Sequence, residues 1–242
     1  MGINWDAPFY GDRNCRLAST ETIMGFSMTI LMGAYRNDKS DVALVADRRS
    51  IPTISSESTS IEDTVKTLRL GDKCAIGFAG AVPLENHVLA DLFRVPLPPQ
   101  DRSLLKGLLA EEHNYDYEFL GAENALNEIV PGVIDFCRPP PEYTLYIILA
   151  GEMPDGRPIL KGCCRGTKWQ VEPYFGDVWS LPREMRSYEE QQKFHDVTHM
   201  PGMDYDDRMI AAVKYCSKYP SVNNHYIIRR LSNGFSQEHG SV

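Results

Sequence analysis

Four residues at the ends of predicted β-strands carry groups that together could perform nucleophilic catalysis. They are Thr29, which opens the first strand, Asp47, which closes the second, Lys66, which precedes the third, and Gly80, which ends the stretch KTLRLGDKCAIGFAG. A threonine hydroxyl is a poor nucleophile until a base takes its proton. A nearby cation lowers the pKa of such a hydroxyl, and a carboxylate can orient that cation through a charge-assisted hydrogen bond. These four residues can form one catalytic centre only if the fold brings the strand ends that carry them together.

The pattern of apolar residues predicts strands and helices that could do this. Alternating or continuous apolar runs predict strands over residues 29–35, 41–47, 67–70, 73–79, 143–150, 158–162, 169–174 and 225–231. The polar stretch RNDKSD predicts a hairpin turn between the first two strands. Helical spacing predicts helices over residues 83–93, 121–137, 183–197 and 204–218, the second kinked at Pro131-Gly132. This order indicates an α+β fold of two antiparallel sheets packed face to face, with helices outside.

Residues 28 to about 93 resemble the proteasome β-type family, which includes bacterial HslV and Anbu-type peptidases. MTILMG resembles the family's first strand, in which the nucleophilic threonine precedes a glycine, here Gly33, by four residues. VALVADRR resembles its second strand, which ends in an acidic residue followed two positions later by an arginine, here Arg49. Lys66, Leu70 and the F-A-G ending at Gly80 match the frame of the family's catalytic lysine. The resemblance implies an N-terminal nucleophile hydrolase with a four-layer αββα fold over residues 29–242.

The resemblance also implies a role for each candidate residue. Thr29 would be the nucleophile, and its own α-amine would be the base. Lys66 would lower the pKa of the hydroxyl, and Asp47 would orient the lysine ammonium. The Gly80 N–H would face the developing oxyanion, and Arg49 would be a positioning charge farther out. The activity implied is hydrolysis of peptide bonds in peptides or unfolded proteins, without a cofactor or a metal.

The position of Thr29 inside the chain raises a question, because an amide nitrogen cannot act as the base. Residues 1–28 are therefore a propeptide, a gate-like extension, or the result of a start assigned upstream of Met28. Family propeptides typically end in glycine, whereas Met28 stands before Thr29, and this favours a start at Met28. A gate-like extension would instead favour a non-catalytic structural subunit, and a small-molecule amidase of the same class is a further alternative.

Other polar residues match the family less well. The family has a glycine-serine-glycine-like turn before its third helix, where this chain offers Gly176-Asp177, and an aspartate and a serine near its last strand, where it offers Ser221. These residues are not assigned catalytic roles. His195 and His199 have the four-residue spacing of helical zinc ligands, but Asp196 replaces the glutamate of HExxH. Two histidines at the end of a polar helix are the favoured interpretation.

Composition and charge argue against several classes of binding partner. A net charge of −8 argues against nucleic acid or an anionic membrane as a partner. No apolar run approaches the roughly 20 residues that span a bilayer. No secretory signal is visible and the cysteines form no CxxC pair, so the sequence predicts a cytoplasmic protein with reduced cysteines. The resemblance implies self-association into a ring or spiral homo-oligomer and leaves room for an ATP-dependent unfoldase as partner.

Overall fold

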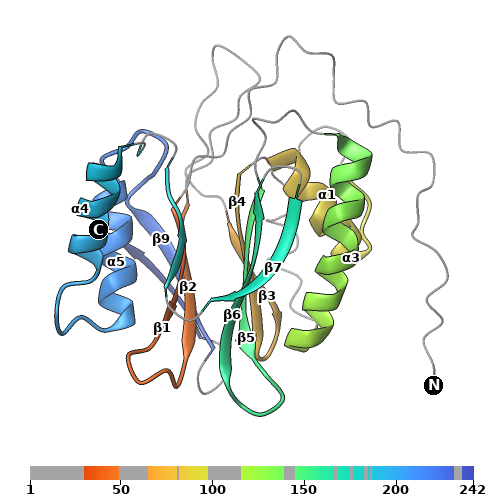
Figure 1. Ribbon diagram of the computed structural model, residues 1–242, viewed down its shortest axis with the longest axis horizontal. Helices are drawn as coiled ribbons and strands as arrows, with labels where there is room; N and C mark the ends of the chain where they lie inside the picture. Colours follow the sequence, from red (N-terminus) through yellow and green to blue (C-terminus); the bar gives the residue numbers. More distant parts are fainter. Residues whose placement is uncertain are drawn as a thin grey trace, which may run out of the picture.

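The computed structural model describes most of the chain from residue 30 onward (Figure 1). The described residues are 30–48, 65–80, 82–97, 116–138, 145–165, 168–174, 177–182, 185, 187–231 and 236–242. They form two five-stranded antiparallel sheets and four α-helices, which confirms the expected α+β class. The predicted extension over residues 1–28, together with Thr29 and Arg49, lies outside the described residues.

The first sheet combines strands from the two ends of the described chain, in the order β10-β9-β2-β1-β8. The strands are β1 (Leu31–Tyr35), β2 (Val42–Asp47), β8 (Val178–Ser180), β9 (His225–Arg230) and β10 (Ser236–Ser241). β1 and β2 form the predicted hairpin, with Leu31 opposite Ala46. The sequence does not predict β8 or β10, because β8 has three residues and the β10 sequence SQEHGS shows no apolar alternation.

The second sheet has the order β3-β4-β5-β6-β7, so each strand pairs with its neighbour in the chain. The strands are β3 (Thr67–Gly71), β4 (Cys74–Gly80), β5 (Leu145–Glu152), β6 (Pro158–Arg165) and β7 (Lys168–Tyr174). β4 is buried at every residue and pairs with β5 along its whole length. Its continuous apolar sequence CAIGFAG is typical of a strand covered on both faces.

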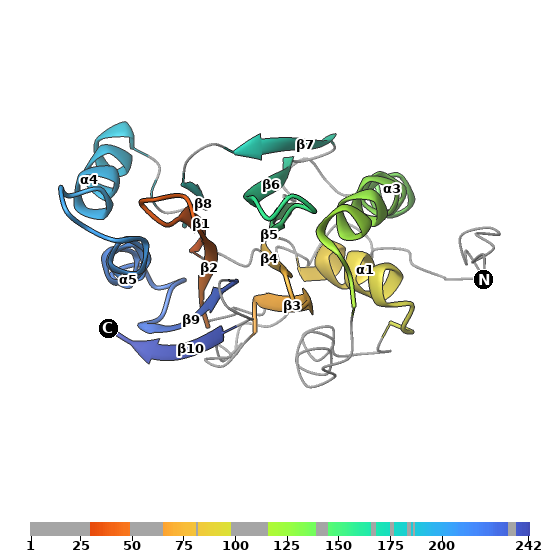
Figure 2. The same ribbon diagram turned by 90° about the horizontal axis from the view of Figure 1, so that it is seen from below.

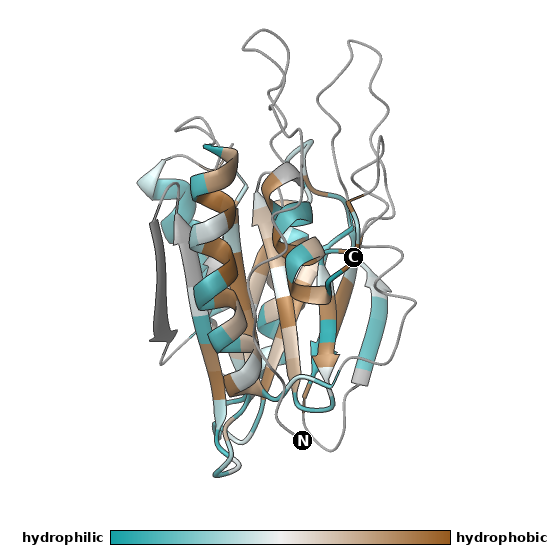
Figure 3. Ribbon diagram, turned by 90° about the vertical axis from the view of Figure 1, so that its right-hand side faces the viewer, coloured by the Kyte–Doolittle hydropathy of each residue, from teal (hydrophilic) through white to brown (hydrophobic). Residues whose placement is uncertain are grey.

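Two helices cover the outer face of each sheet, which gives four layers (Figure 2). They are α1 (Val82–Phe93) and α3 (Phe119–Cys137) over the second sheet, and α4 (Tyr188–Thr198) and α5 (Tyr205–Cys216) over the first. α3 continues through Pro131, and hydrophobic and hydrophilic residues alternate around it (Figure 3). α4 begins at Tyr188 rather than at residue 183, because the Ser187 side chain caps it by accepting a hydrogen bond from the Glu190 N–H. None of the described helices is both long and apolar enough to cross a membrane.

The two sheets pack directly against each other through small and aliphatic residues. The apolar cluster between them includes Leu31 and Leu44 from the first sheet and Ala75 and Ile148 from the second. Gly77 of β4 allows a close approach, because a Cβ at this position would lie 2.5 Å from Leu31 Cδ1. A polar side chain that crosses from one sheet to the other is therefore shielded from water.

Candidate active site

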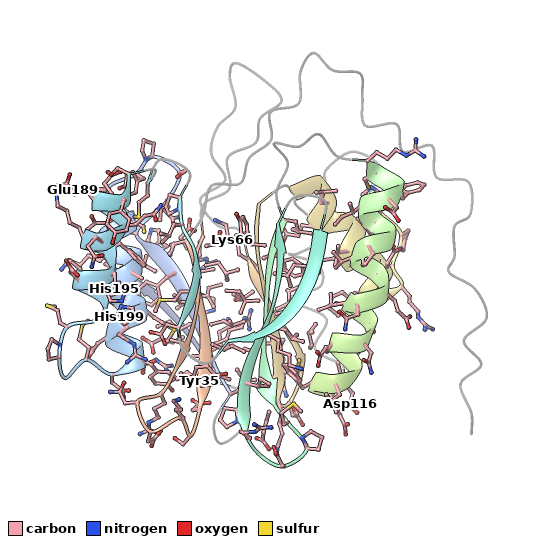
Figure 4. The ribbon with its side chains drawn as sticks, viewed as in Figure 1. Tyr35, Lys66, Asp116, Glu189, His195 and His199 are labelled. Carbon is pink, nitrogen blue, oxygen red and sulfur yellow. The ribbon has the colours of Figure 1, made fainter. Side chains whose placement is uncertain are left out.

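Lys66 and Asp47 form a buried ion pair between the two sheets. Asp47 ends β2 in the first sheet, and Lys66 immediately precedes β3 in the second. Lys66 Nζ lies 2.9 Å from Asp47 Oδ1, and the two side chains are 1% and 0% exposed. Figure 4 shows Lys66 between the sheets. The structure thus brings together two of the candidate catalytic residues.

Backbone hydrogen bonds fix the positions of both ion-pair partners. The Ile30 N–H donates to Asp47 Oδ1 at 3.1 Å, and the Asp47 N–H donates to the Ile30 carbonyl at 3.3 Å. On the other sheet, the Phe78 N–H donates to the Lys66 carbonyl at 2.9 Å. Asp47 Oδ1 therefore accepts from a cation and from the amide of the residue that follows Thr29 in the chain.

The burial of this ion pair is unusual for a contact that only stabilises a fold. Moving an ammonium and a carboxylate out of water costs several kcal/mol per ion, and apolar residues of similar size are often at least as stabilising. Charged groups held in a water-excluded setting are typical of sites that use the charge in binding or catalysis. The pair is therefore the strongest candidate for a functional centre among the described residues.

Gly80 ends β4 on the same side of the sandwich as the ion pair. Its φ of 124° lies in a region that side-chain-bearing residues rarely adopt, so this position favours glycine. The Lys66 carbonyl bonds to Phe78, and Gly80 lies two residues farther along β4. At about 3.4 Å per residue, this places the Gly80 backbone about 7 Å along the strand from Phe78. The Gly80 backbone is thus near Lys66.

The segment before β9 adds two buried polar residues to which the sequence assigns no role. The Arg48 N–H donates to Asn223 Oδ1 at 3.0 Å and to the His225 carbonyl at 3.1 Å. Asn223 is 4% exposed, and Ser221 is fully buried. These contacts place the segment beside the end of β2, next to Asp47. In the sequence, both residues belong to the polar run SVNN, which precedes an apolar strand. That run alone does not align Ser221 with the serine that the family has near its last strand.

Three residues considered from the sequence are not part of the described centre. Thr29 and Arg49 lie outside the described residues, so their positions stay predictions. Asp177 lies away from the ion pair, where its carboxylate accepts hydrogen bonds from Arg208 Nε at 2.8 Å and from the Tyr35 N–H at 3.3 Å. Tyr35 is the last residue of β1, so Asp177 holds the opposite end of the first sheet.

His195 and His199 lie on the outer side of the first sheet, at the end of α4 (Figure 4). Their rings stack, with centroids 4.3 Å apart and planes 6° from parallel. His199 Nε2 lies 3.4 Å from Asp177 Oδ2, and burial lowers the pKa of His199. Within the described ranges, no three His, Cys, Asp or Glu side chains are grouped so that they could hold a metal ion.

The chain matches no model of a known protein family, and no curated protein is significantly similar to it in sequence. The geometry around Lys66 and Asp47 is therefore the feature that bears most directly on function.

Proposed function

We propose that the protein is a proteasome-like threonine peptidase of the N-terminal nucleophile hydrolase class, with Thr29 as its nucleophile. The observation that most supports this function is the buried Lys66–Asp47 pair, in which Asp47 Oδ1 also accepts a hydrogen bond from the Ile30 amide. A peptide bond joins that amide to Thr29. The pair therefore contacts Ile30, the residue joined to the proposed nucleophile. The four layers of helices and sheets are compatible with the fold of this class.

The proposed reaction begins when the Thr29 hydroxyl adds to the carbonyl carbon of a peptide bond. The hydroxyl proton passes to the Thr29 α-amine, which acts as the base. The resulting tetrahedral oxyanion collapses, the C–N bond breaks, and the leaving amine takes the proton. Water then hydrolyses the acyl ester on Thr29, which releases the second product and restores the hydroxyl.

Lys66, Asp47 and Gly80 have electrostatic roles in this reaction. The Lys66 ammonium stabilises negative charge that develops on the hydroxyl oxygen, and Asp47 holds the ammonium in place. The Gly80 N–H, at the end of β4, donates to the oxyanion. Because the ion pair is shielded from water, its charges act on nearby atoms more strongly than they would in bulk solvent.

The free α-amine of Thr29 is the critical requirement, and it gives the test of the proposed function. We expect a chain whose mature N-terminus is Thr29 to hydrolyse peptides, and Thr29→Ala in that chain to be inactive with an unchanged circular dichroism spectrum. N-terminal sequencing and intact mass of the native protein identify the active species. Full hydrolysis by a chain that retains Met1, or by Thr29→Ala, would rule out this mechanism.

A non-catalytic structural subunit of a proteasome-like assembly is the alternative, and the internal position of Thr29 favours it. Both functions use the same fold, but only the peptidase requires cleavage or initiation directly before Thr29. If the native chain keeps its first 28 residues and remains inactive, the structural role is the better explanation.

We further propose that the peptidase acts in the cytoplasm as a ring or spiral of identical subunits, with peptides or unfolded proteins as substrates. Enclosure of the nucleophiles in a chamber would protect folded proteins from an unselective hydrolase. An ATP-dependent unfoldase would then be the partner that supplies unfolded chains. These proposals follow from the resemblance in the strand region and depend on the peptidase assignment.

A further inference from the structure

We propose that the C-terminal strand β10 positions the Lys66–Asp47 pair through the side chains of Gln237 and His239. The kinetic part of this inference rests on the proposed peptidase function, whereas its structural part does not. Asp47 is followed by Arg48, and Lys66 is followed by Thr67. Side-chain contacts connect each of these two neighbours to β10.

The first connection runs from Arg48 to His239. Arg48 Nη1 lies 3.0 Å from His239 Nδ1, across 191 residues of sequence. The Arg48 backbone is fixed at the same time, because its N–H donates to Asn223 Oδ1 and to the His225 carbonyl. His239 therefore holds the side chain of a residue whose backbone directly continues from Asp47.

The second connection runs from Thr67 through Arg229 to Gln237 and crosses between the sheets. Arg229 lies in β9 of the first sheet, is 5% exposed, and donates from Nε to the Thr67 carbonyl at 3.0 Å and to Thr67 Oγ1 at 2.8 Å. Its Nη1 donates to Gln237 Oε1. Thr67 begins β3 directly after Lys66, so Gln237 and Arg229 hold the start of that strand.

The two connections reach neighbouring side chains of β10, because Gln237 and His239 lie in contact. Gln237 and His239 are two residues apart and lie on the same face of the strand. Glu238 lies on the opposite face and forms an ion pair with Arg230 at 2.6 Å. Lys66 and Asp47 thus contact each other directly, and the residue that follows each of them is connected to β10.

The contact with Arg48 requires a neutral His239, because only an unprotonated Nδ1 can accept a hydrogen bond from Arg48. Burial lowers the pKa of His239, and the positive charges of Arg48 and Arg229 lower it further. The lowered pKa favours the uncharged imidazole, which is the form that can accept from Arg48.

The test compares three variants of β10, two at His239 on one face of the strand and one at Glu238 on the opposite face. His239→Ala removes the acceptor for Arg48, and His239→Gln restores an acceptor oxygen. Glu238→Gln is the matched control, because it removes a charge pair from the same strand but on the other face. We expect His239→Ala to lower kcat for peptide hydrolysis about tenfold with KM unchanged. His239→Gln and Glu238→Gln should keep kcat close to the wild-type value.

Amide hydrogen exchange in the full chain provides a readout that needs no enzymatic activity. The Ile30 amide reports on Asp47, and the Phe78 amide reports on Lys66, because each is bonded to that residue. We expect both to exchange about tenfold faster in His239→Ala than in the two other variants. Equal exchange in all three variants would overturn the inference, and so would an equal loss of kcat in Glu238→Gln. If the wild-type protein hydrolyses no peptide but the exchange pattern appears, the peptidase assignment fails and the positioning role of β10 stands.

Discussion

At the scale of single residues, the charged side chains buried between the sheets affect both the stability of the fold and the proposed reaction. Lys66, Asp47 and Arg229 are all buried, so each depends on protein partners in place of water. Removal of one group changes the free energy of unfolding and also the electrostatic field at the candidate active site. The two effects can be separated only when substitutions are made in pairs.

Lys66→Met should abolish hydrolysis and also lower the free energy of unfolding by about 3–5 kcal/mol, because it leaves the Asp47 carboxylate buried without its cation. The double variant Lys66→Met/Asp47→Asn should recover much of that stability but none of the activity. Urea unfolding and a peptide-hydrolysis assay measure the two properties. A Lys66→Met protein as stable as the wild type would contradict this account of the ion pair.

The matched control is Lys161→Met, which removes the lysine of another ion pair. Lys161 Nζ lies 2.8 Å from Glu123 Oε1, and these side chains are 18% and 14% exposed. Because water still reaches this pair, the loss of stability should be smaller than for Lys66→Met. Activity should stay at the wild-type level, since Lys161 lies in β6 and contacts α3 rather than the candidate site.

His199 should make the fold less stable in mild acid. Burial is the main cause that lowers its pKa, with smaller contributions from His195 and Arg208, and Asp177 opposes the shift. As the pH falls through about 6.5, the unfolded chain binds a proton before the folded one does, so stability decreases. The melting temperature should therefore fall between about pH 7.5 and pH 5.5, and less steeply in His199→Gln. An identical pH profile for His199→Gln and wild type would contradict this, and exposed His225→Gln serves as control.

At the scale of elements, the contact between β1 and β4 determines how closely the sheets approach. Gly77 of β4 faces Leu31 of β1, whose side chain is fully buried. Both residues lie near the strand ends that carry the ion pair. A change in the spacing between these strands should therefore change the distance between Lys66 and Asp47.

Gly77→Ala should reduce the free energy of unfolding by about 1–3 kcal/mol, because its Cβ would overlap Leu31 in a packed core. Leu31→Val in the same chain should restore part of the loss, since it removes the overlapping methyl group. Chemical denaturation of both variants tests this expectation. If Leu31→Val fails to improve Gly77→Ala, the overlap is not the cause of the destabilisation.

The elements predicted from the sequence are those with a strong apolar pattern. β4 and β5 follow continuous apolar runs, and the hairpin of β1 and β2 has a clear polar turn. β10 carries no such pattern, because its partners are polar side chains on β9 and at the end of β2. Among the candidate site residues, Asp47 and Lys66 lie in contact, as their expected roles require, and the catalytic roles themselves stay predictions. The contacts of Asn223 and His239 could not be predicted, since they depend on pairing between distant parts of the chain.

At the scale of the whole molecule, and among the side chains that the structure describes, only one of the two helices over the second sheet exposes large apolar residues that could contact another subunit. The apolar residues of α1 from Leu84 to Leu89 are buried within the single chain, so they need no neighbouring subunit to cover them. α3 exposes Leu120 and Phe136, which are 39% and 38% accessible. The apolar character of α1 thus gives no support to self-association, whereas α3 remains a candidate contact.

Sedimentation of the active chain should show a closed ring or open spiral of about six or more subunits, a number supplied by the family resemblance. Leu120→Lys/Phe136→Asp should shift the protein toward smaller species if α3 lies in the subunit interface, and exposed Asn124→Asp on the same helix is the control. A monomer that remains fully active at micromolar concentration would contradict the chambered enzyme. It would favour a small-molecule amidase instead.

The strand order of the first sheet also has a consequence for biosynthesis. β2 lies between β1, from the beginning of the described chain, and β9, from its end. A nascent chain therefore cannot complete this sheet until residues 225–241 have left the ribosome. Arg48 receives its backbone partners from the same late segment. A peptidase built in this way would stay inert during translation until residues 225–241 have been made and have joined the sheet.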